Sequence, residues 1–246
     1  MKNPPLPTKI LFLQDYDGTL TDFDQDPEDS HITPSIRRLL RNLRKRHRII
    51  LVSGRHLEGL TRVSGLKEFP MVGTHGFESR RLPGGLRMSS PANQRRFRKE
   101  AARLFKALQV LKRRYSGIFI ESKPFSSTLH YRGARLSPRK EQDLFREFTS
   151  IYRKIVTVKN WSLQGGKKMI EAMPRGFSKA KAVKIIVDRH PGYLPVYAGD
   201  DVADAEVFKI LGKKGLKVAV GKRIPDKLCD LRLKNPKEFL DWLKTF

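Results

Sequence analysis

The stretch KILFLQDYDGT, residues 9–19, passes from a short apolar run directly into two aspartates and a glycine. An apolar run that is stopped by acids and Gly18 is typical of a buried parallel strand that delivers polar residues to a loop. In open α/β sheets, ligands bind beyond the carboxyl ends of the strands. We therefore expect Asp15 and Asp17 to lie at that edge of a parallel sheet.

Strands and helices alternate on either side of a middle segment that has a different pattern. Residues 92–173 begin with a long basic amphipathic helix and continue with half-exposed alternating strands, which predicts an inserted α+β domain. Residues 1–91 and 174–246 show the alternation of a doubly wound α/β domain with a parallel sheet. The expected strands are 9–14, 48–53, 69–73, 118–122, 127–131, 154–161, 168–172, 194–198 and 215–220, and the expected helices are 36–46, 56–63, 95–115, 138–152, 178–189, 203–211 and 236–244.

Basic residues dominate the composition: 51 lysines and arginines stand against 25 acids in 246 residues, a formal charge of +26. Such a charge suits a nucleic-acid or anionic-membrane partner, or a solvated surface that favours anionic substrates. The basic residues are spread from Arg37 to Lys244, and no zinc-finger spacing or aromatic RNA-binding signature accompanies them. The sequence therefore favours the solvated surface, and we expect no nucleic-acid partner.

The N-terminal segment and the single cysteine bear on the cellular compartment of the protein. The apolar run before Gln14 is too short for a signal peptide, and no apolar stretch approaches the length of a membrane span. Cys229 alone cannot form an internal disulfide, so no oxidising compartment is required. We expect a cytoplasmic protein that does not associate with a membrane.

Acidic residues follow two of the expected strands. Asp15 and Asp17 come after the first strand; an Asp-Gly pair also suits a tight turn, but a turn leaves Asp15 unexplained. Asp200, Asp201 and Asp204 follow a later buried strand, in a chain where acids are scarce. Oxygen ligands gathered at a strand end suit Mg²⁺. The two clusters predict a divalent-cation site, at which Asp15 could also bond to phosphorus.

Two weaker signals concern phosphate. Ser53, Gly54 and Arg55 end the second strand, where a hydroxyl and backbone amides could hold a phosphoryl oxygen, although a Ser-Gly pair also marks ordinary strand ends. Ser178 is a helix N-cap, followed by Lys179, which could reach the same phosphate. In a chain this basic, a lysine alone carries little information.

In this order, the segments around Asp15, Ser53, Lys179 and Asp200 resemble the four motifs of the haloacid dehalogenase (HAD) superfamily, with a cap inserted between the second and third. The resemblance implies a Rossmann-like core, a C2-type cap domain and a Mg²⁺-dependent phosphatase. It implies that Asp15 is the nucleophile that forms an aspartyl-phosphate and that Asp17 is the acid and base. It also assigns phosphoryl binding to Ser53 and Lys179, metal binding to Asp15, Asp17 and Asp200, and a supporting position behind the metal to Asp201 and Asp204.

More narrowly, nearly the whole chain resembles the trehalose-6-phosphate phosphatases. The similarity lies in DYDGTLT at 15–21, GTHGFE at 73–78, LHYR at 129–132 and GKKMIE at 166–171. Gln14, usually apolar in this family, and Ala180, usually glycine, depart from it, and the second departure leaves open whether Lys179 or Lys181 contacts phosphate. The resemblance implies trehalose 6-phosphate as substrate and a trehalose-6-phosphate synthase as a candidate pathway partner. The residues that it marks for substrate contact are Glu78, His130, Arg132, Lys168, Glu171, Gly54 and Arg55.

Two alternatives stay open at the level of sequence. A phosphatase for another glycosyl phosphate, such as mannosyl-3-phosphoglycerate, would need cationic contacts for the extra carboxylate of its substrate, whereas Glu78 and Glu171 favour hydroxyls. A basic nucleic-acid-binding protein on a disabled phosphatase core is opposed by the intact acids at positions 15, 17 and 200.

Overall fold

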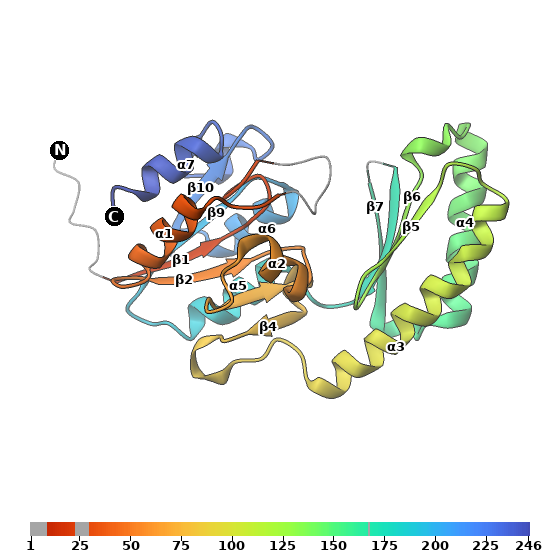
Figure 1. Cartoon of the computed structure of the whole chain (residues 1–246), viewed down its shortest axis with the longest axis horizontal. Helices are drawn as coiled ribbons and strands as arrows, with labels where there is room; N and C mark the ends of the chain where they lie inside the picture. The colour runs from red at the N-terminus through yellow and green to blue at the C-terminus, as the bar shows by residue number, and fades with distance from the viewer. Residues whose placement is uncertain (1–8, 23–29, 167) are drawn as a thin grey trace. The chain divides into compact units, whose positions relative to one another are not determined.

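The computed structural model of the protein describes residues 9–22, 30–166 and 168–246 (Figure 1). The chain divides into two compact units. The core unit comprises the residues up to Met88 together with Phe177–Phe246, and the inserted unit comprises Ser89–Gly176. Each unit has a sheet of its own, and each is described by itself below.

A seven-stranded sheet forms the centre of the core unit. In spatial order its strands are β11 (Leu231–Leu233), β10 (Leu216–Val220), β9 (Leu194–Gly199), β1 (Ile10–Gln14), β2 (Arg48–Val52), β3 (Met71–Gly73) and β4 (Glu78–Arg80). Only β3 and β4 pair in antiparallel fashion; the other neighbours are parallel. In the register of the central strands, Gln14 lies opposite Leu51 and Ala198. The segments that follow β1, β2 and β9 therefore meet at one edge of the sheet.

Helices cover both faces of this sheet (Figure 1), as the alternation of side chains along β1 requires. Ile10 and Phe12 belong to a buried cluster that includes residues of three helices, and Leu11 and Leu13 to a second cluster with residues of two others. The first set is α1 (Pro34–Leu43), α2 (Leu57–Ser64) and α7 (Pro236–Leu243), and the second is α5 (Lys179–Asp188) and α6 (Val202–Leu211).

The inserted unit combines a four-stranded antiparallel sheet with two long helices. In spatial order the strands are β5 (Phe119–Ser122), β6 (Ser127–His130), β8 (Met169–Pro174) and β7 (Trp161–Gly166). Helices α3 (Pro91–Leu108) and α4 (Pro138–Ile155) pack against each other, and α3 contacts β5 and β6. Their buried stripes include Leu104 of α3 and Phe148 of α4, both fully buried, so the helices cover one face of the sheet.

The strand predicted at 154–161 is wrong. α4 continues to Ile155, because the buried stripe that ends at Tyr152 keeps its helical spacing against the rest of the unit. A short 3₁₀ turn, Val158–Asn160, follows, and β7 begins only at Trp161. The local alternation of apolar and polar residues was therefore overridden by tertiary packing.

Other differences concern element ends. α3 begins before the predicted residue 95, because Ser90 is an N-cap and Pro91 takes the first helical position. The three-residue strands β4 and β11 were not predicted, since runs this short carry no periodic signal. None of the helices within the described residues combines the length and apolarity needed to cross a bilayer.

Gln14 is a polar residue in an apolar setting at the end of β1. Its side chain is fully buried, and neither amide atom has a hydrogen-bond partner in the part of the chain that the structure describes. A buried amide without a partner loses its bonds to water and gains none in return.

We expect Gln14→Met to raise the free energy of unfolding by about 1–3 kcal/mol, because the desolvation penalty disappears at nearly constant volume. Urea denaturation followed by circular dichroism measures the change. Leu13→Met is the matched control, since it makes an apolar exchange at the adjacent buried position and should cost less than about 1.5 kcal/mol. A loss of stability in Gln14→Met would show that the amide is satisfied in the folded protein.

Candidate active site

Asp15 lies directly after β1 and is buried beside the lysine that opens α5. Lys179 Nζ donates to Asp15 Oδ1 at 2.7 Å and to Asp204 Oδ1 at 2.9 Å. Ser178 caps α5 because its hydroxyl accepts the backbone N–H of Lys181, which fixes the turn that carries Lys179. The side chain of Lys181 is exposed. Of the two lysines, Lys179 is therefore the one that reaches Asp15.

Asp204 joins the end of β9 and the start of α6 to this ion pair. Its Oδ1 also accepts the Tyr197 hydroxyl at 2.7 Å, and its Oδ2 accepts the backbone N–H groups of Asp200 and Asp201. Asp201 in turn accepts the Asp204 N–H, which completes a capping box at α6. With hydrogen bonds on both oxygens, Asp204 holds Lys179 and the two neighbouring aspartates in place.

Asp200 faces the loop after β1 at very short range. A Cβ added to Gly18 would lie 2.6 Å from the Asp200 carboxylate, and Gly18 has a φ of +79°, so both space and backbone require glycine. Arg223 Nη1 donates to Asp200 Oδ2 at 3.1 Å. One carboxylate oxygen from each of Asp15, Asp200 and Asp204 lies within 4.8 Å of the others. These buried acids form a cluster that could hold a metal ion.

Negative charge exceeds positive charge in this cluster. Burial, followed by repulsion from Asp204, raises the pKa of Asp15 well above its usual value despite the attraction of Lys179. Burial and the neighbouring acids, Asp204 first, raise the pKa of Asp200 to about 7. Burial disfavours the charged form of Lys179, but the surrounding carboxylates, Asp15 first, hold its pKa above the usual range. A bound cation would relieve the remaining repulsion, so the hard oxygen donors present fit a divalent ion such as Mg²⁺.

Asp17 is held by an arginine from the loop after β2. Arg55 Nε donates to Asp17 Oδ2 at 2.7 Å and Nη2 donates to Oδ1 at 2.6 Å, a bidentate pair. The side chain of Arg55 is 12% exposed and that of Asp17 is 22% exposed, so water screens the pair only weakly. The carboxylate of Asp17 is thus engaged with Arg55 and is not part of the acid cluster.

The loop that carries Ser53 is braced by a strained segment after β3. Ser53 Oγ accepts the Arg55 N–H at 3.1 Å, and the Ser53 carbonyl accepts the His75 N–H at 3.2 Å. Thr74 and His75 have φ values of +47° and +51°, a left-handed backbone that is costly for side-chain-bearing residues. A Cβ on Gly54 would lie 2.6 Å from the His75 ring. Close packing between the two loops therefore fixes the position of Ser53.

Glu78, which the sequence predicts as a substrate contact, supports this strained segment. Its Oε2 accepts the Thr74 hydroxyl at 2.5 Å and the Leu57 N–H at 3.1 Å, at the start of α2. The side chain is buried. Glu78 therefore has a structural role in the core unit that the sequence did not indicate.

Glu171 lies on the sheet of the inserted unit. Its Oε1 accepts hydrogen bonds from Lys123 Nζ at 3.1 Å and from the Ser126 hydroxyl at 2.8 Å. The β-ladders place Glu171 opposite Thr128 and Thr128 opposite Glu121. These three side chains share one face of the sheet, opposite the face on which Ser127 donates to the Ala101 carbonyl of α3. Thr128 and Glu171 are buried on this face.

The other predicted substrate residues of the inserted unit also have local surroundings of their own. His130 Nε2 lies 3.0 Å from Glu121 Oε2. Lys168 has a φ of +63° and pairs with Glu141 of α4. Arg132 begins a short 3₁₀ turn and is exposed. The inserted unit thus presents a polar, hydrogen-bonding sheet face with adjoining charged turns.

Several residues of these arrangements were not expected from the sequence. Tyr197 could have been found, because a tyrosine hydroxyl inside a buried strand needs a partner. Arg223 is one of 51 basic residues and carries no local signal. Lys123 and Ser126 become recognisable only through the strand pairing that brings them to Glu171.

A buried carboxylate beside a lysine, with further acids at the next strand end, suits phosphoryl transfer, in which positioning and charge stabilisation supply most of the catalysis. The family model described as trehalose-phosphatase matches residues 13–227. The chain belongs to the trehalose-phosphatase family. The match spans all the residues of the acid cluster, the Asp17–Arg55 pair and the polar sheet face of the inserted unit.

Relatives in this family share between a quarter and a third of their residues with the chain. A probable trehalose-phosphate phosphatase of Sinorhizobium fredii is 31% identical over 221 residues, which are 87% of this chain and 78% of the relative. The trehalose-6-phosphate phosphatase of Escherichia coli is 28% identical over 225 residues, 89% of this chain and 80% of the relative. The chain spans only about half, 52%, of the Mycobacterium tuberculosis trehalose-phosphate phosphatase, to which it is 29% identical.

Solved structures share the fold of this chain over nearly its whole length. A trehalose-6-phosphate phosphatase related protein matches with a TM-score of 0.78 and 22% identity, over 96% of both chains. The C-terminal domain of the Candida albicans trehalose-6-phosphate phosphatase matches with a TM-score of 0.70 and 24% identity, over 97% of this chain and 92% of the other. At these identities the structural likeness establishes the fold alone.

We expect Gly18→Ala to abolish phosphatase activity and to weaken divalent-cation binding, because the new methyl group would displace the Asp200 carboxylate. Isothermal titration calorimetry with Mg²⁺ and phosphate-release assays measure the two effects. Gly84→Ala is the matched control: its φ of +68° imposes a similar backbone strain, but no atom lies within 4 Å of the added Cβ. Equal losses in both variants would attribute the effect to backbone strain and contradict the role of close contact with Asp200.

Proposed function

We propose that the chain is a Mg²⁺-dependent phosphatase that hydrolyses trehalose 6-phosphate to trehalose and inorganic phosphate. The observation that carries the proposal is the buried Asp15–Lys179 pair within a cluster of acids, in a chain that belongs to the trehalose-phosphatase family. The relatives from Sinorhizobium fredii and Escherichia coli are named as phosphatases of trehalose phosphate, which supports this substrate. A trehalose-6-phosphate synthase would then supply this substrate in the same pathway.

In the first step, a carboxylate oxygen of Asp15 bonds to phosphorus while the bond between phosphorus and the sugar oxygen breaks, and Asp17 gives a proton to that oxygen. In the second step, Asp17 takes a proton from a water whose oxygen attacks phosphorus, and the bond to Asp15 breaks. Both acids return to their starting forms. Arg55 takes one acceptor position on each oxygen of Asp17, so the second lone pair of each oxygen stays available to the proton.

The predicted metal ligands are Asp15, Asp200 and the backbone carbonyl of Asp17. Mg²⁺ bound there would neutralise charge on the carboxylates and on the phosphoryl group. Asp204 and Asp201 would position the ligands without touching the metal. Asp204 does so by accepting hydrogen bonds from Lys179 and from the backbone N–H of Asp200. The excess negative charge of the cluster supports this assignment.

The phosphoryl oxygens would be bound by Ser53 and Lys179, with Gly54 and Arg55 continuing the same loop. Lys179 suits this role because it is already fixed beside Asp15 by two carboxylates. A positioned ammonium group and hydroxyl stabilise the charge on the equatorial oxygens of the transferring group.

Residues 92–173 would act as the cap that selects the sugar. A disaccharide offers only hydroxyls, so its site needs paired donors and acceptors, and the polar sheet face of the inserted unit provides them. The residues proposed for this contact are His130, Arg132, Lys168 and Glu171, with Glu78 from the core unit.

The test is phosphate release from a panel that contains trehalose 6-phosphate, glucose 6-phosphate, mannosyl-3-phosphoglycerate and p-nitrophenyl phosphate. We expect trehalose 6-phosphate to have the highest kcat/KM, by at least about tenfold, and activity to vanish with a chelator. Asp15→Asn should remove activity by about 10³-fold or more, because the nucleophile is lost. Asp188→Asn, an exposed acid in a surface ion pair, is the matched control and should leave activity unchanged.

Two outcomes would contradict the proposal at different levels. Preference for mannosyl-3-phosphoglycerate would replace the substrate and keep the mechanism. Activity of Asp15→Asn equal to that of the wild type would exclude Asp15 as the nucleophile.

A further inference from the structure

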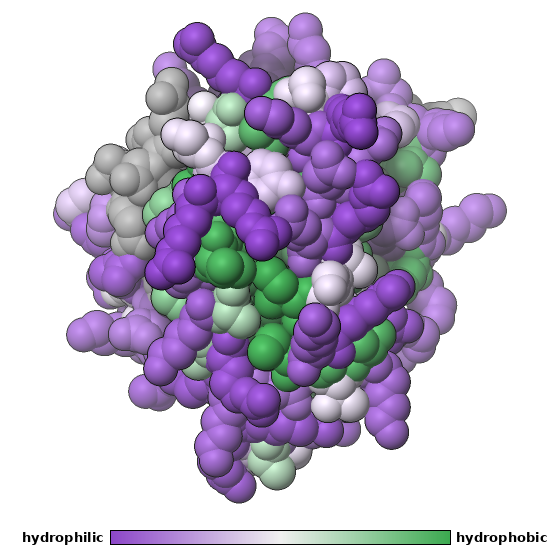
Figure 2. Space-filling view, turned by 90° about the vertical axis from the view of Figure 1, so that its right-hand side faces the viewer, coloured by the Kyte–Doolittle hydropathy of each residue, from purple (hydrophilic) through white to green (hydrophobic). Residues whose placement is uncertain are grey.

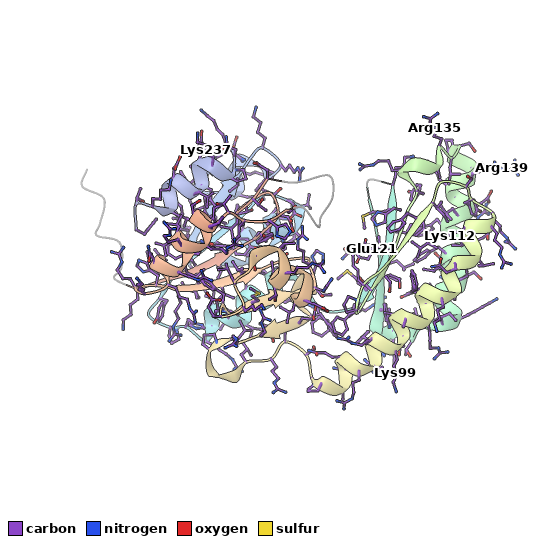
Figure 3. The ribbon with its side chains drawn as sticks, in the orientation of Figure 1. Lys99, Lys112, Glu121, Arg135, Arg139 and Lys237 are labelled. Carbon is purple, nitrogen blue, oxygen red and sulfur yellow. The ribbon has the colours of Figure 1, made fainter. Side chains whose placement is uncertain are left out.

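The inserted unit carries most of the excess charge of the protein. Residues 89–176 contain 21 lysines and arginines against 6 aspartates and glutamates, a formal charge of +15 out of +26. The even spread of basic residues along the sequence therefore conceals a concentration in one folded unit. Lys99, Lys112 and Arg139 project from its helical side, whereas Glu121 belongs to the sheet (Figure 3).

The acids of α3 and α4 are already counted in this net charge, and each has a hydrogen-bonding partner in the inserted unit. The exposed basic side chains Arg103, Lys106, Arg153 and Lys154 have no ion-pair partner among the described residues. The acids and their partners are Glu100 with the Trp161 indole N–H, Glu141 with Lys168, Asp143 with Arg146, and Glu147 with Arg114.

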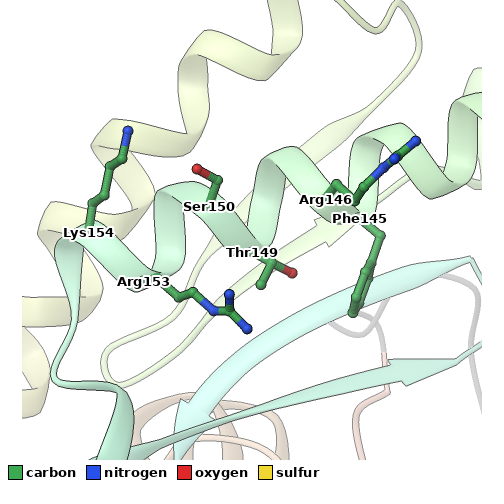
Figure 4. A pocket seen from close by; sticks show the side chains of 6 residues that line it. All are labelled: Phe145, Arg146, Thr149, Ser150, Arg153 and Lys154. Atoms are coloured by element: carbon green, nitrogen blue, oxygen red, sulfur yellow. The ribbon is translucent and has the colours of Figure 1, made fainter.

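One face of α4 forms a shallow depression of about 500 Å³ (Figure 4). Residues one turn apart along a helix lie on one face, so the lining side chains form two adjacent rows. They bring together three cations, two hydroxyls and a phenyl ring that is 47% exposed. The buried hydroxyl in one row, Thr149 Oγ1, has no hydrogen-bond partner among the described residues. The rows are Phe145, Thr149 and Arg153, and Arg146, Ser150 and Lys154.

We propose that this face of α4 binds single-stranded nucleic acid through its phosphodiester backbone, without sequence preference. The cations of Arg153 and Lys154 match phosphate oxygens, and Arg146 can join them by exchanging Asp143 for a phosphate. The exposed hydroxyl of Ser150 can donate to the same groups. The ring of Phe145 offers a surface on which an unpaired base can stack. A cationic surface with an interleaved aromatic ring is the combination that single strands require.

The same surface does not suit insertion into an anionic membrane. A helix that binds a membrane interface needs a continuous apolar face, but the apolar faces of α3 and α4 are buried within the unit. In Figure 2 hydrophilic side chains cover most of the surface that faces the viewer, and hydrophobic side chains gather mainly near its centre.

The lining residues lie on a single helix, and none takes part in the acid cluster or in the proposed sugar contacts. Nucleic-acid binding at this face is therefore independent of the proposed phosphatase activity. The concentrated positive charge of the inserted unit would then serve a partner and not only solubility.

The experiment measures binding of a fluorescein-labelled oligouridylate of about 20 nucleotides to the full chain, by fluorescence anisotropy at several salt concentrations. We expect the triple variant Arg146→Gln, Arg153→Gln, Lys154→Gln to bind at least about tenfold more weakly at low salt. Its slope of log K against log salt should fall by about 2, since each phosphate contact to a single strand contributes about 0.7. Phe145→Ala should weaken binding about fivefold or more without changing the slope.

The matched control removes the same charge from exposed positions of the core unit: Arg38→Gln, Lys45→Gln, Lys67→Gln. It should bind within about threefold of the wild type. Equal losses in the two triple variants would overturn the proposal, because the binding would then follow total charge. Binding to phosphatidylserine vesicles without binding to RNA would overturn it in favour of a membrane surface. Unchanged phosphatase activity and thermal unfolding of the α4 variant show that it is folded.

Discussion

The ammonium group of Lys179, buried between Asp15 and Asp204, is the interaction on which the rest of the site depends. It joins the end of β1, the first turn of α5 and the first turn of α6. Removing one partner of a buried ion pair strongly destabilises the folded protein, because the other charge stays buried without compensation. One lysine stands among several carboxylates, and burial, followed by repulsion from Asp204, raises the pKa of both Asp15 and Asp200. A divalent cation bound between Asp15, Asp200 and Asp204 would offset the repulsion among their carboxylates.

The loops around the ion pair are arranged by close contacts as much as by charge. Gly18 leaves room for the Asp200 carboxylate, and Gly54 leaves room for the ring of His75. The left-handed backbone at Thr74 and His75 is supported by the buried Glu78, which receives the Thr74 hydroxyl. Strain of this kind persists only where surrounding structure enforces it, and here it fixes the loop that presents Ser53.

The sequence predicted the parts of the fold that depend on long periodic patterns. The strand before Asp15 and the helix after Ser178 were recognisable because apolar spacing and a capping residue agreed. The segment 154–161 was mistaken for a strand, since packing of α4 outweighed its local alternation. The acids after two of the strands, at positions 15, 17, 200, 201 and 204, were recognisable because acids are scarce in this chain. The structural role of Glu78 and the contact from Arg223 depend on tertiary neighbours that no local pattern encodes.

The proposed mechanism requires that Asp15 itself bonds to phosphorus. Its most direct test is to mix the protein with trehalose 6-phosphate and Mg²⁺, quench with acid within milliseconds, reduce with borohydride, and identify the modified peptide by mass spectrometry. An aspartyl-phosphate is reduced to homoserine, so we expect homoserine at position 15 and at no other aspartate. Homoserine elsewhere, or an unmodified Asp15 under conditions where phosphate is released, would contradict it.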